Sequence, residues 1–281
     1  MKTMLLFLSM LYSIDVHCVP TLFCMATYGK VLDVSARRLR PILQHNKFCT
    51  ERLLPGRSAF KSDQFQYTSC DIMLYGAGST SQLSSDAVGL ALLDEIDDWD
   101  EGDEESTEGG MFGQAESRTK SYGVYAKTVI ATSPTTADRI GYREYLTGTQ
   151  SEWQVPCPHC GGFQTMVFKE KKGPGGFRWP KEMRVPAEVY ENTWYECKFC
   201  EGMIEDDHRY EMQQSGRWVD TKENNRHKSY RLSSLNVLPD IYPMGHFAER
   251  YLKCFPIDSN GKAMTGATAY PDRLHIVVNH D

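Results

Sequence analysis

The sequence predicts an α/β protein in which a parallel sheet is followed by a smaller, cysteine-rich module. Short apolar runs have the length of strands buried on both faces, and segments with helical spacing of apolar residues lie between several of them. After Gln150 the amino-acid composition changes, and cysteine, glycine, proline and aromatic residues become frequent. A chain of 281 residues with 41% hydrophobic content is long enough for one large and one small domain.

Four apolar runs are the expected strands of the sheet. They lie at 21–27, 71–75, 89–93 and 127–132. After the first run, Tyr28 to Leu43 carries apolar residues at roughly helical spacing, and we expect this helix to end around Pro41. Because such strands alternate with helices, the sheet is expected to be parallel.

The N-terminal run from Met4 to Tyr12 allows two interpretations. A lysine before an apolar run is typical of a secretory signal, which would imply an exported protein with disulfide bonds. Lys2 and Thr3 before a buried helix are also how a phosphate-binding loop ends. No small-residue cleavage pattern follows the run, and no apolar run reaches the roughly 18 residues that span a bilayer. An odd total of nine cysteines fits a reducing compartment better than a disulfide framework.

Asp94 and Glu95 directly follow the apolar run at 89–93. In nucleotide hydrolases, a buried strand delivers an aspartate to the magnesium shell, and the next glutamate orients and deprotonates the attacking water. The competing interpretation is a solvated acidic loop, since nine of the twelve residues from Asp94 to Glu105 are acidic. Both interpretations remain open at this point.

The run at 127–132 ends in Thr132, Ser133, Pro134 and Thr135. Small hydroxyl residues at the carboxyl end of a strand would lie near a γ-phosphate in this architecture. An ordinary exit from strand to turn, marked by proline, explains the same residues. The order of the two elements along the chain favours the nucleotide interpretation for both.

The clearest motif consists of two Cys-x-x-Cys pairs, and its members are Cys157, Cys160, Cys197 and Cys200. Two residues between ligands let a tight turn present both sulfurs to one ion, so four thiolates predict a tetrahedral Zn²⁺ site of structural type. The spacer of 36 residues is long, and we expect 173–180 to be a looped-out excursion. His159 and His208 are expected outside the ligand set. Two unrelated pairs or a redox motif are the alternatives.

The charge of the chain excludes a simple basic binding module. Its formal net charge is −6 and its pI is about 5.8, so contact with a polyanion would need a local patch. Short basic clusters at 169–172 and 226–228 could touch a phosphate backbone, although such runs are usually solvated faces.

Taken together, the chain resembles the large terminase subunits of tailed bacteriophages, of the kind typified by phage lambda's packaging enzyme. The resemblance runs from Lys2 to about Cys254. Its most specific stretches, in chain order, are 92–97, 101–103, 117–119, 132–135, 155–161, 179–180, 195–197, 216–218 and 230–235. Order and spacing across so many elements argue against coincidence.

The resemblance implies a P-loop NTPase-type sheet at 1–150, a zinc-ribbon module at 151–235, and at 236–281 the start of a linker toward a nuclease domain, with a divergent tail. Lys2 and Thr3 resemble the end of the ATP-binding loop, Asp94 the Mg²⁺-coordinating acid and Glu95 the catalytic glutamate. Thr132 to Thr135 resemble the motif that couples hydrolysis to movement. The four cysteines resemble the zinc ribbon.

The implied function is ATP-driven packaging of viral DNA into procapsids in the host bacterial cytoplasm. The implied partners are double-stranded viral DNA, a small terminase subunit and the portal of the procapsid, with homo-oligomers in full-length relatives and no membrane. The rival hypothesis is a non-enzymatic zinc-ribbon module that binds DNA or protein.

The chain departs from the family pattern at three places. Met1 stands where the last glycine of the phosphate-binding loop belongs, so the first strand and the glycine-rich loop are missing. Since backbone N–H groups of that loop cradle the phosphates, we expect the 281-residue chain to bind ATP weakly and to hydrolyse it slowly or not at all. The residues at 83–86 stand where the family usually has arginine or lysine, and we expect no nuclease domain within residues 1–281.

Overall fold

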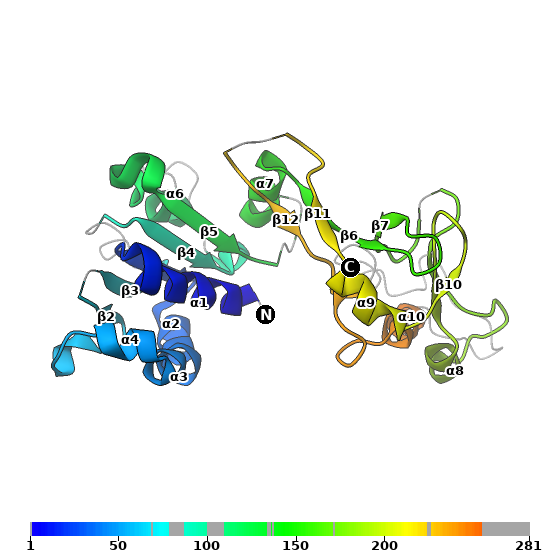
Figure 1. Ribbon diagram of the computed structural model, residues 1–281, viewed down its shortest axis with the longest axis horizontal. Coiled ribbons are helices and arrows are strands. Elements are labelled where there is room, and N and C mark those ends of the chain that lie inside the picture. Colours follow the sequence, from blue (N-terminus) through cyan, green and yellow to red (C-terminus); the bar gives the residue numbers. More distant parts are fainter. Residues whose placement is uncertain are drawn as a thin grey trace. The chain divides into compact units, whose positions relative to one another are not determined.

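Residues 2–68, 70–78, 87–99, 110–133, 136, 138–170, 172–223 and 226–254 are described in a computed structural model (Figure 1). The chain divides into two compact units, Met1–Arg143 and Glu144–Asp281. The strand-like run expected at 274–278, residues 83–86, and Pro134 and Thr135 lie outside the described residues. The boundary predicted at residue 150 stays a prediction.

The first unit contains a five-stranded sheet in the order β2-β3-β1-β4-β5. Its strands are β1 (Thr21–Met25), β2 (Gln64–Gln66), β3 (Asp71–Gly76), β4 (Leu90–Asp94) and β5 (Lys127–Ala131). All pairs are parallel except the one between β2 and β3 at the edge. The predicted α/β class with a parallel sheet is therefore confirmed.

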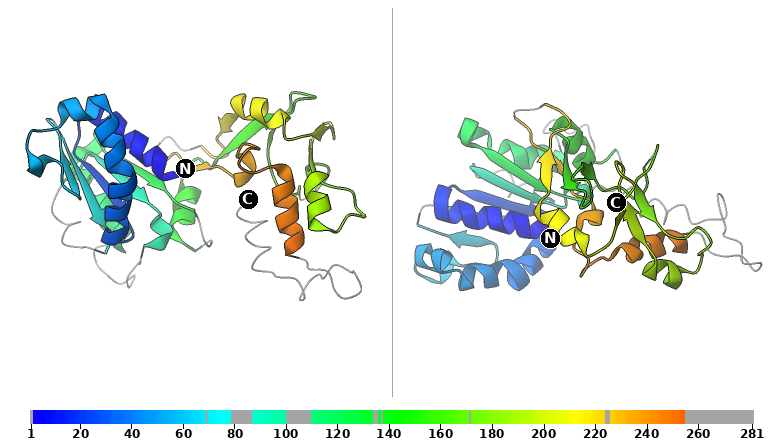
Figure 2. Two further views of the ribbon diagram at one scale, coloured as in Figure 1. Left: turned by 90° about the horizontal axis from the view of Figure 1, so that it is seen from below. Right: turned by 45° about the vertical axis from the view of Figure 1, so that its right-hand side comes forward.

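Helices cover both faces of this sheet, as Figures 1 and 2 show. The helical elements of the unit are α1 (Lys2–Tyr12), α2 (Tyr28–Val34), α3 (Arg40–His45), α4 (Lys47–Arg52) and α6 (Gly110–Ser117), with 3-10 or π turns at Ser13–His17, Ser35–Leu39, Arg57–Ala59, Ile96–Asp98 and Lys120–Tyr125. Helix α7 (Ile140–Thr147) begins in this unit and continues past its end at Arg143. Alternate residues along the strands point to opposite faces, so Phe23 packs in the core with α1, α2 and α3, whereas Leu22 packs with α6. The result is a three-layer arrangement.

Helix α1 is buried on one face only. Leu6, Phe7 and Met10 are fully buried in the core beneath it, while Leu5 and Leu8 are more than half exposed. The helix is thus an integral part of this unit, and its burial, which was expected from the sequence, is limited to the face that packs on the core. Among the described residues, no helix combines the length and apolarity needed to cross a bilayer.

The helix expected to end around Pro41 continues to His45. Proline removes one backbone donor and crowds the preceding turn, which normally stops a helix. Here a π-helical turn, Ser35–Leu39, precedes the proline and Pro41 falls in the first turn of α3. The wider π-helical turn accommodates the proline ring, so the helix continues in the same direction past Pro41. The helix end predicted from the sequence is therefore wrong.

The second unit contains two small sheets, one of order β10-β9-β8 and one of order β11-β6-β12 with β7 paired to β6. The strands are β6 (Ser151–Pro156), β7 (Phe163–Thr165), β8 (Gly176–Arg178), β9 (Trp194–Glu196), β10 (Met203–Ile204), β11 (Arg217–Val219) and β12 (Tyr230–Arg231). The helical elements are α8 (Pro186–Glu191), α9 (His208–Gln214), a 3-10 turn at Ser234–Asn236, and α10 (Met244–Lys253). Aromatic and sulfur-containing side chains form its core.

The long spacer between the cysteine pairs is not simply looped out. Within the stretch 173–180, Gly176–Arg178 forms β8, which pairs antiparallel with β9. Phe177 on this strand is buried and packs edge-to-face against Tyr195, with ring centroids 5.5 Å apart. The glycines that suggested a loop provide the turn before the strand, since Gly173 and Gly175 both adopt positive φ. The expected excursion is therefore corrected to a strand of the module's sheet.

Arg209 on α9 is a fully buried cation of the second unit, with 0% exposure. Its guanidinium donates hydrogen bonds to Asp206 Oδ1 (2.7 Å) and to the backbone carbonyls of Leu235 (3.1 Å), Val237 and Tyr242 (2.9 Å). Asp206 Oδ2 in turn accepts from the backbone N–H of Met244, 2.9 Å away, where α10 begins. This pair of charges joins α9, the loop at 235–242 and α10.

Candidate functional site

The first candidate site lies at the carboxyl edge of the parallel sheet. Asp94 is the last residue of β4, and the register places it beside Ala131, the last residue of β5. Thr132 and Ser133 follow β5 at the same edge. In parallel sheets this edge is where ligands bind, so the strand order itself brings these residues together.

The N-terminal end of α1 reaches the same edge. The Lys2 ammonium donates a hydrogen bond to the Ser133 hydroxyl. Burial lowers the pKa of Lys2, and the carboxylates of Asp94, Glu95 and Asp97 oppose that shift. Residues from three distant parts of the sequence therefore converge, because α1 packs across β4 and β5.

Asp94 has the environment of a cation ligand. It is 1% exposed, and neither of its carboxylate oxygens has a hydrogen bond of normal geometry with the described residues. Burial raises the pKa of Asp94, and the nearby Thr3 hydroxyl and Lys2 ammonium offset part of that rise. A buried carboxylate without partners costs free energy, and a divalent cation beside it would remove that cost.

The turn after β4 holds Glu95 in a fixed conformation. Glu95 has φ of 52°, which is uncommon for a residue other than glycine, and its N–H donates to the Ala131 carbonyl at 2.8 Å. The Trp99 indole donates to the Asp94 carbonyl at 3.1 Å. Strained backbone held by neighbouring hydrogen bonds is frequent at functional sites.

Two residues beside this turn were not predicted from the sequence. Lys30 on α2 lies 3.8 Å from Glu95 Oε2 and 3.0 Å from Asp98 Oδ2. Asp97 is 5% exposed and contacts both Thr132 and Gly141. Asp97 belongs to the acidic run that suggested a solvated loop, and nothing in the local pattern indicated that it was buried.

The second candidate site is the cluster of Cys157, Cys160, Cys197 and Cys200. Their sulfur atoms all lie within 4.8 Å of one another, with Cys157 Sγ 3.8 Å from Cys200 Sγ and Cys160 Sγ 3.9 Å from Cys197 Sγ. For Zn–S bonds of about 2.3 Å, a regular tetrahedron has sulfur separations of roughly 3.8 Å. The donor set and its spacing therefore fit one Zn²⁺ ion.

Two similar turns present the sulfurs. In the first, which follows β6, the N–H of His159 points to Cys157 Sγ (3.4 Å) and the N–H of Gly161 bonds to the Cys157 carbonyl (2.9 Å). In the second, which follows β9, the N–H of Phe199 points to Cys197 Sγ (3.4 Å). Gly161 and Glu201, each directly after the second cysteine of its pair, both adopt positive φ. Equivalent backbone turns thus supply equivalent pairs of ligands.

Burial and hydrogen bonding act in opposite directions on these thiols. Burial raises the pKa of Cys157 to about 12. Burial also acts to raise the pKa of Cys197, but hydrogen bonds from the backbone N–H groups of Cys200 and Phe199, together with those from the Cys157 and Cys200 thiols, outweigh it and lower the pKa to about 7. A bound cation would favour the thiolate form at all four positions.

Both histidines near the cluster bond elsewhere. A ring nitrogen of His159 lies 2.6 Å from the Met203 carbonyl, and the N–H of Glu205 donates to His208 Nδ1 at 3.0 Å. Among the described residues, the four cysteines are the group with metal-binding geometry.

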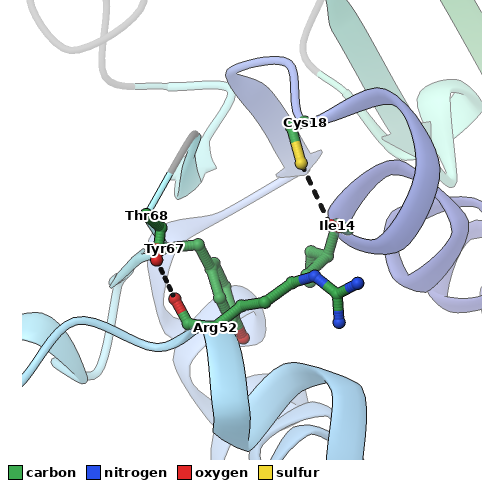
Figure 3. A pocket seen from close by; sticks show the side chains of 5 residues that line it. All are labelled: Ile14, Cys18, Arg52, Tyr67 and Thr68. Carbon is green, nitrogen blue, oxygen red and sulfur yellow. Dashed lines mark hydrogen bonds between the residues drawn. The ribbon is translucent and has the colours of Figure 1, made fainter.

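A cavity of about 240 Å³ in the first unit lies apart from the residues predicted for the site (Figure 3). It is lined by Ile14, Cys18, Arg52, Tyr67 and Thr68. Thr68 Oγ1 donates to the Arg52 carbonyl at 3.0 Å, and the Arg52 guanidinium forms a 3.0 Å ion pair with Asp15. Thr68 and Arg52 therefore already bond to the protein itself.

The fold defines a mixed α/β protein with a parallel sheet and a four-cysteine cluster. Residues 1–218 match the family "Phage terminase large subunit gpA, ATPase domain", and the chain belongs to this family. Among solved structures, the large terminase from a thermophilic bacteriophage is similar at 15% identity, with a TM-score of 0.37 over 50% of this chain. The match spans 33% of that terminase. No curated protein matches the chain.

Proposed function

We propose that this chain is the ATPase part of a terminase motor that drives viral DNA into procapsids. The observation that carries the proposal is the convergence of Lys2, Asp94 and Ser133 at one sheet edge, around a buried carboxylate that makes no hydrogen bond of normal geometry with the described residues. Membership of the terminase family supports the same conclusion.

In this proposal the P-loop-type site is divided among four groups of residues. Lys2 and Thr3 contact the phosphates of ATP, and Asp94 holds Mg²⁺, which would neutralise developing phosphate charge when bound. Glu95 accepts the proton of the attacking water. Thr132 to Thr135 sense the γ-phosphate and couple its loss to movement.

The four cysteines are proposed to hold a structural Zn²⁺ in a ribbon-like module. Four thiolates leave no open coordination position, so the ion would stabilise the fold and take no part in ATP chemistry. The proposed domains are an ATPase domain at 1–150, the zinc-ribbon module at 151–235 and a linker at 236–281. Double-stranded DNA, a small terminase subunit and the portal are the proposed partners, in the host cytoplasm.

Substitutions of the two acids test the ATPase proposal. Glu95→Gln should leave Mg-ATP affinity within about threefold and lower single-turnover hydrolysis by about 10² or more, because the proton acceptor is lost. Asp94→Asn should weaken Mg²⁺-dependent ATP binding by about tenfold or more, since the cation loses a charged ligand. Binding is measured by titration calorimetry, and turnover with protein in excess over labelled ATP so that slow hydrolysis is detected.

Glu51→Gln is the matched control. Glu51 lies on α4 in an exposed ion pair with Lys47, so its loss should change neither quantity. Measurable turnover in wild type that is equal in Glu95→Gln would contradict the assignment of the catalytic glutamate. DNA binding that is insensitive to ATP and to Glu95→Ala would instead favour a non-enzymatic zinc-ribbon module.

A further inference from the structure

The start of helix α7 is bonded directly to the turn that follows β4. Asp97 lies in that turn, and its Oδ1 accepts a hydrogen bond from the N–H of Gly141, 2.7 Å away. Gly141 is the second residue of α7, where backbone N–H groups lack partners within the helix. A carboxylate at this position also interacts favourably with the helix dipole.

The same aspartate contacts the segment after β5. Its backbone N–H donates to Thr132 Oγ1 at 3.4 Å. A Cβ atom added to Gly141 would lie 2.4 Å from Thr132 Cγ2 and 2.5 Å from Asp97 Oδ1. Thr132, Asp97 and Gly141 are therefore packed so closely that none can shift far without moving another.

This packed group adjoins the proposed nucleotide site. Ser133, the neighbour of Thr132, accepts the hydrogen bond from Lys2. Asp97 shares its turn with Asp94 and Glu95, and hydrogen bonds from Glu95 to Ala131 and from Trp99 to Asp94 fix that turn. Helix α7 contains the boundary between the two units, which falls after Arg143.

We propose that Asp97 is a positioning residue that joins the nucleotide site to α7, by holding Gly141 with its carboxylate and Thr132 with its backbone N–H. The inference rests on the proposed ATPase function. A shift of Thr132 and Ser133 on binding or loss of the γ-phosphate is transmitted through Asp97 to the first turn of α7. In this scheme Asp97 contacts neither ATP nor the attacking water molecule.

Amide hydrogen exchange of the full-length protein, measured for the segment 138–147, tests the proposal. Without nucleotide, Asp97→Ala should speed exchange of the Gly141 amide by about tenfold, because its acceptor is removed, whereas Asp97→Asn keeps an oxygen acceptor and should stay within about threefold of wild type. With saturating Mg²⁺ and a slowly hydrolysed ATP analogue, exchange in α7 should change in wild type. That response should be absent in Asp97→Ala.

Asp33→Ala is the matched control. This substitution removes a carboxylate that forms an exposed ion pair with Arg37, 2.7 Å away. The rate of amide exchange in α7 should therefore remain as in wild type. Circular dichroism establishes that each variant is folded. Unchanged Gly141 exchange in Asp97→Ala would overturn the holding role, and a retained nucleotide response would overturn the transmission.

A separate binding measurement distinguishes this inference from the proposed function. If calorimetry detects no analogue binding to wild type, the ATPase proposal fails and transmission from a nucleotide fails with it. The nucleotide-free comparison of Asp97→Ala with Asp97→Asn still decides whether Asp97 holds α7. If the analogue binds and wild-type α7 does not respond, the ATPase proposal survives and the transmission is overturned.

Discussion

Replacing Cys197 with serine is expected to remove zinc from the protein and to unfold both cysteine turns. Cys197 is fully buried, and its sulfur lies 3.9 Å from Cys160 Sγ in the four-sulfur cluster. Structural Zn²⁺ in small modules contributes an apparent binding free energy of about 10–16 kcal/mol at neutral pH, which is comparable to the whole free energy of unfolding of a typical protein, about 5–15 kcal/mol. Metal analysis by plasma emission should give one zinc per chain in wild type and none in the variant.

Cys254→Ala is the control for this experiment. Cys254 is also buried in the core of the second unit, and its thiol bonds to the Arg250 carbonyl at 3.4 Å rather than to the cluster. This variant should keep its zinc and lose only a small amount of stability. Wild-type protein purified without zinc, yet with the same near-UV circular dichroism as zinc-loaded protein, would refute the structural role of the metal.

The second large effect is expected from Arg209→Met. Methionine has a similar length and no donors, so the change leaves Asp206 and the carbonyls of Leu235, Val237 and Tyr242 without the guanidinium. Each buried polar group left without a partner costs about 1–3 kcal/mol, and the carbonyl of the buried Leu235 loses its donor in this variant. Asp206 has 32% of its side chain exposed, so its carboxylate regains water and adds little to the cost. Urea unfolding of the zinc-saturated protein, followed by tryptophan fluorescence, measures the loss.

Arg217→Met provides the comparison. Arg217 lies on the exposed strand β11, with its guanidinium 3.8 Å from the centre of the Phe163 ring. A cation–π contact at such a site is worth about 0.5–1 kcal/mol, so the urea midpoint should move little. A loss for Arg209→Met no larger than that for Arg217→Met would show that the buried network does not stabilise the second unit.

Four of the five strands of the first unit's sheet were predictable because they fall in apolar runs, whereas β2 (Gln64–Gln66) has no such run and was missed. In runs such as 89–93, side chains on both faces of the strand are apolar, so both faces must be shielded from water. The helices that lie between the strands in the sequence provide that cover. Lys2, Asp94 and Ser133 were also predictable, since each follows or precedes such an element and strand ends meet at one edge. Their roles remain predictions.

Residues that depend on tertiary contacts were not predictable. Asp97 and Arg209 are charged side chains of the kind that normally stay exposed, and only the full set of partners makes their burial possible. The strand at Gly176–Arg178 was missed because three residues carry too little pattern, and its pairing with β9 decides its conformation. Local sequence also gave no sign of the π-helical turn before Pro41.

The segment between the two cysteine pairs can be lengthened at little cost in chain entropy. A metal ion that joins the two cysteine turns closes a loop of 36 residues, and the entropic cost of closing a loop rises by only about 0.6 kcal/mol for each doubling of its length. The turn at Gly173–Gly175 precedes β8 and bears no cysteine. Gly175 packs against Lys198 of the second cysteine turn and donates to Glu196 Oε1 at 3.0 Å, whereas a Cβ added to Gly173 would meet nothing within 4 Å. Residues inserted beside Gly173 would therefore lengthen the loop at little thermodynamic cost, and that position suits a grafted peptide or a fluorescent label.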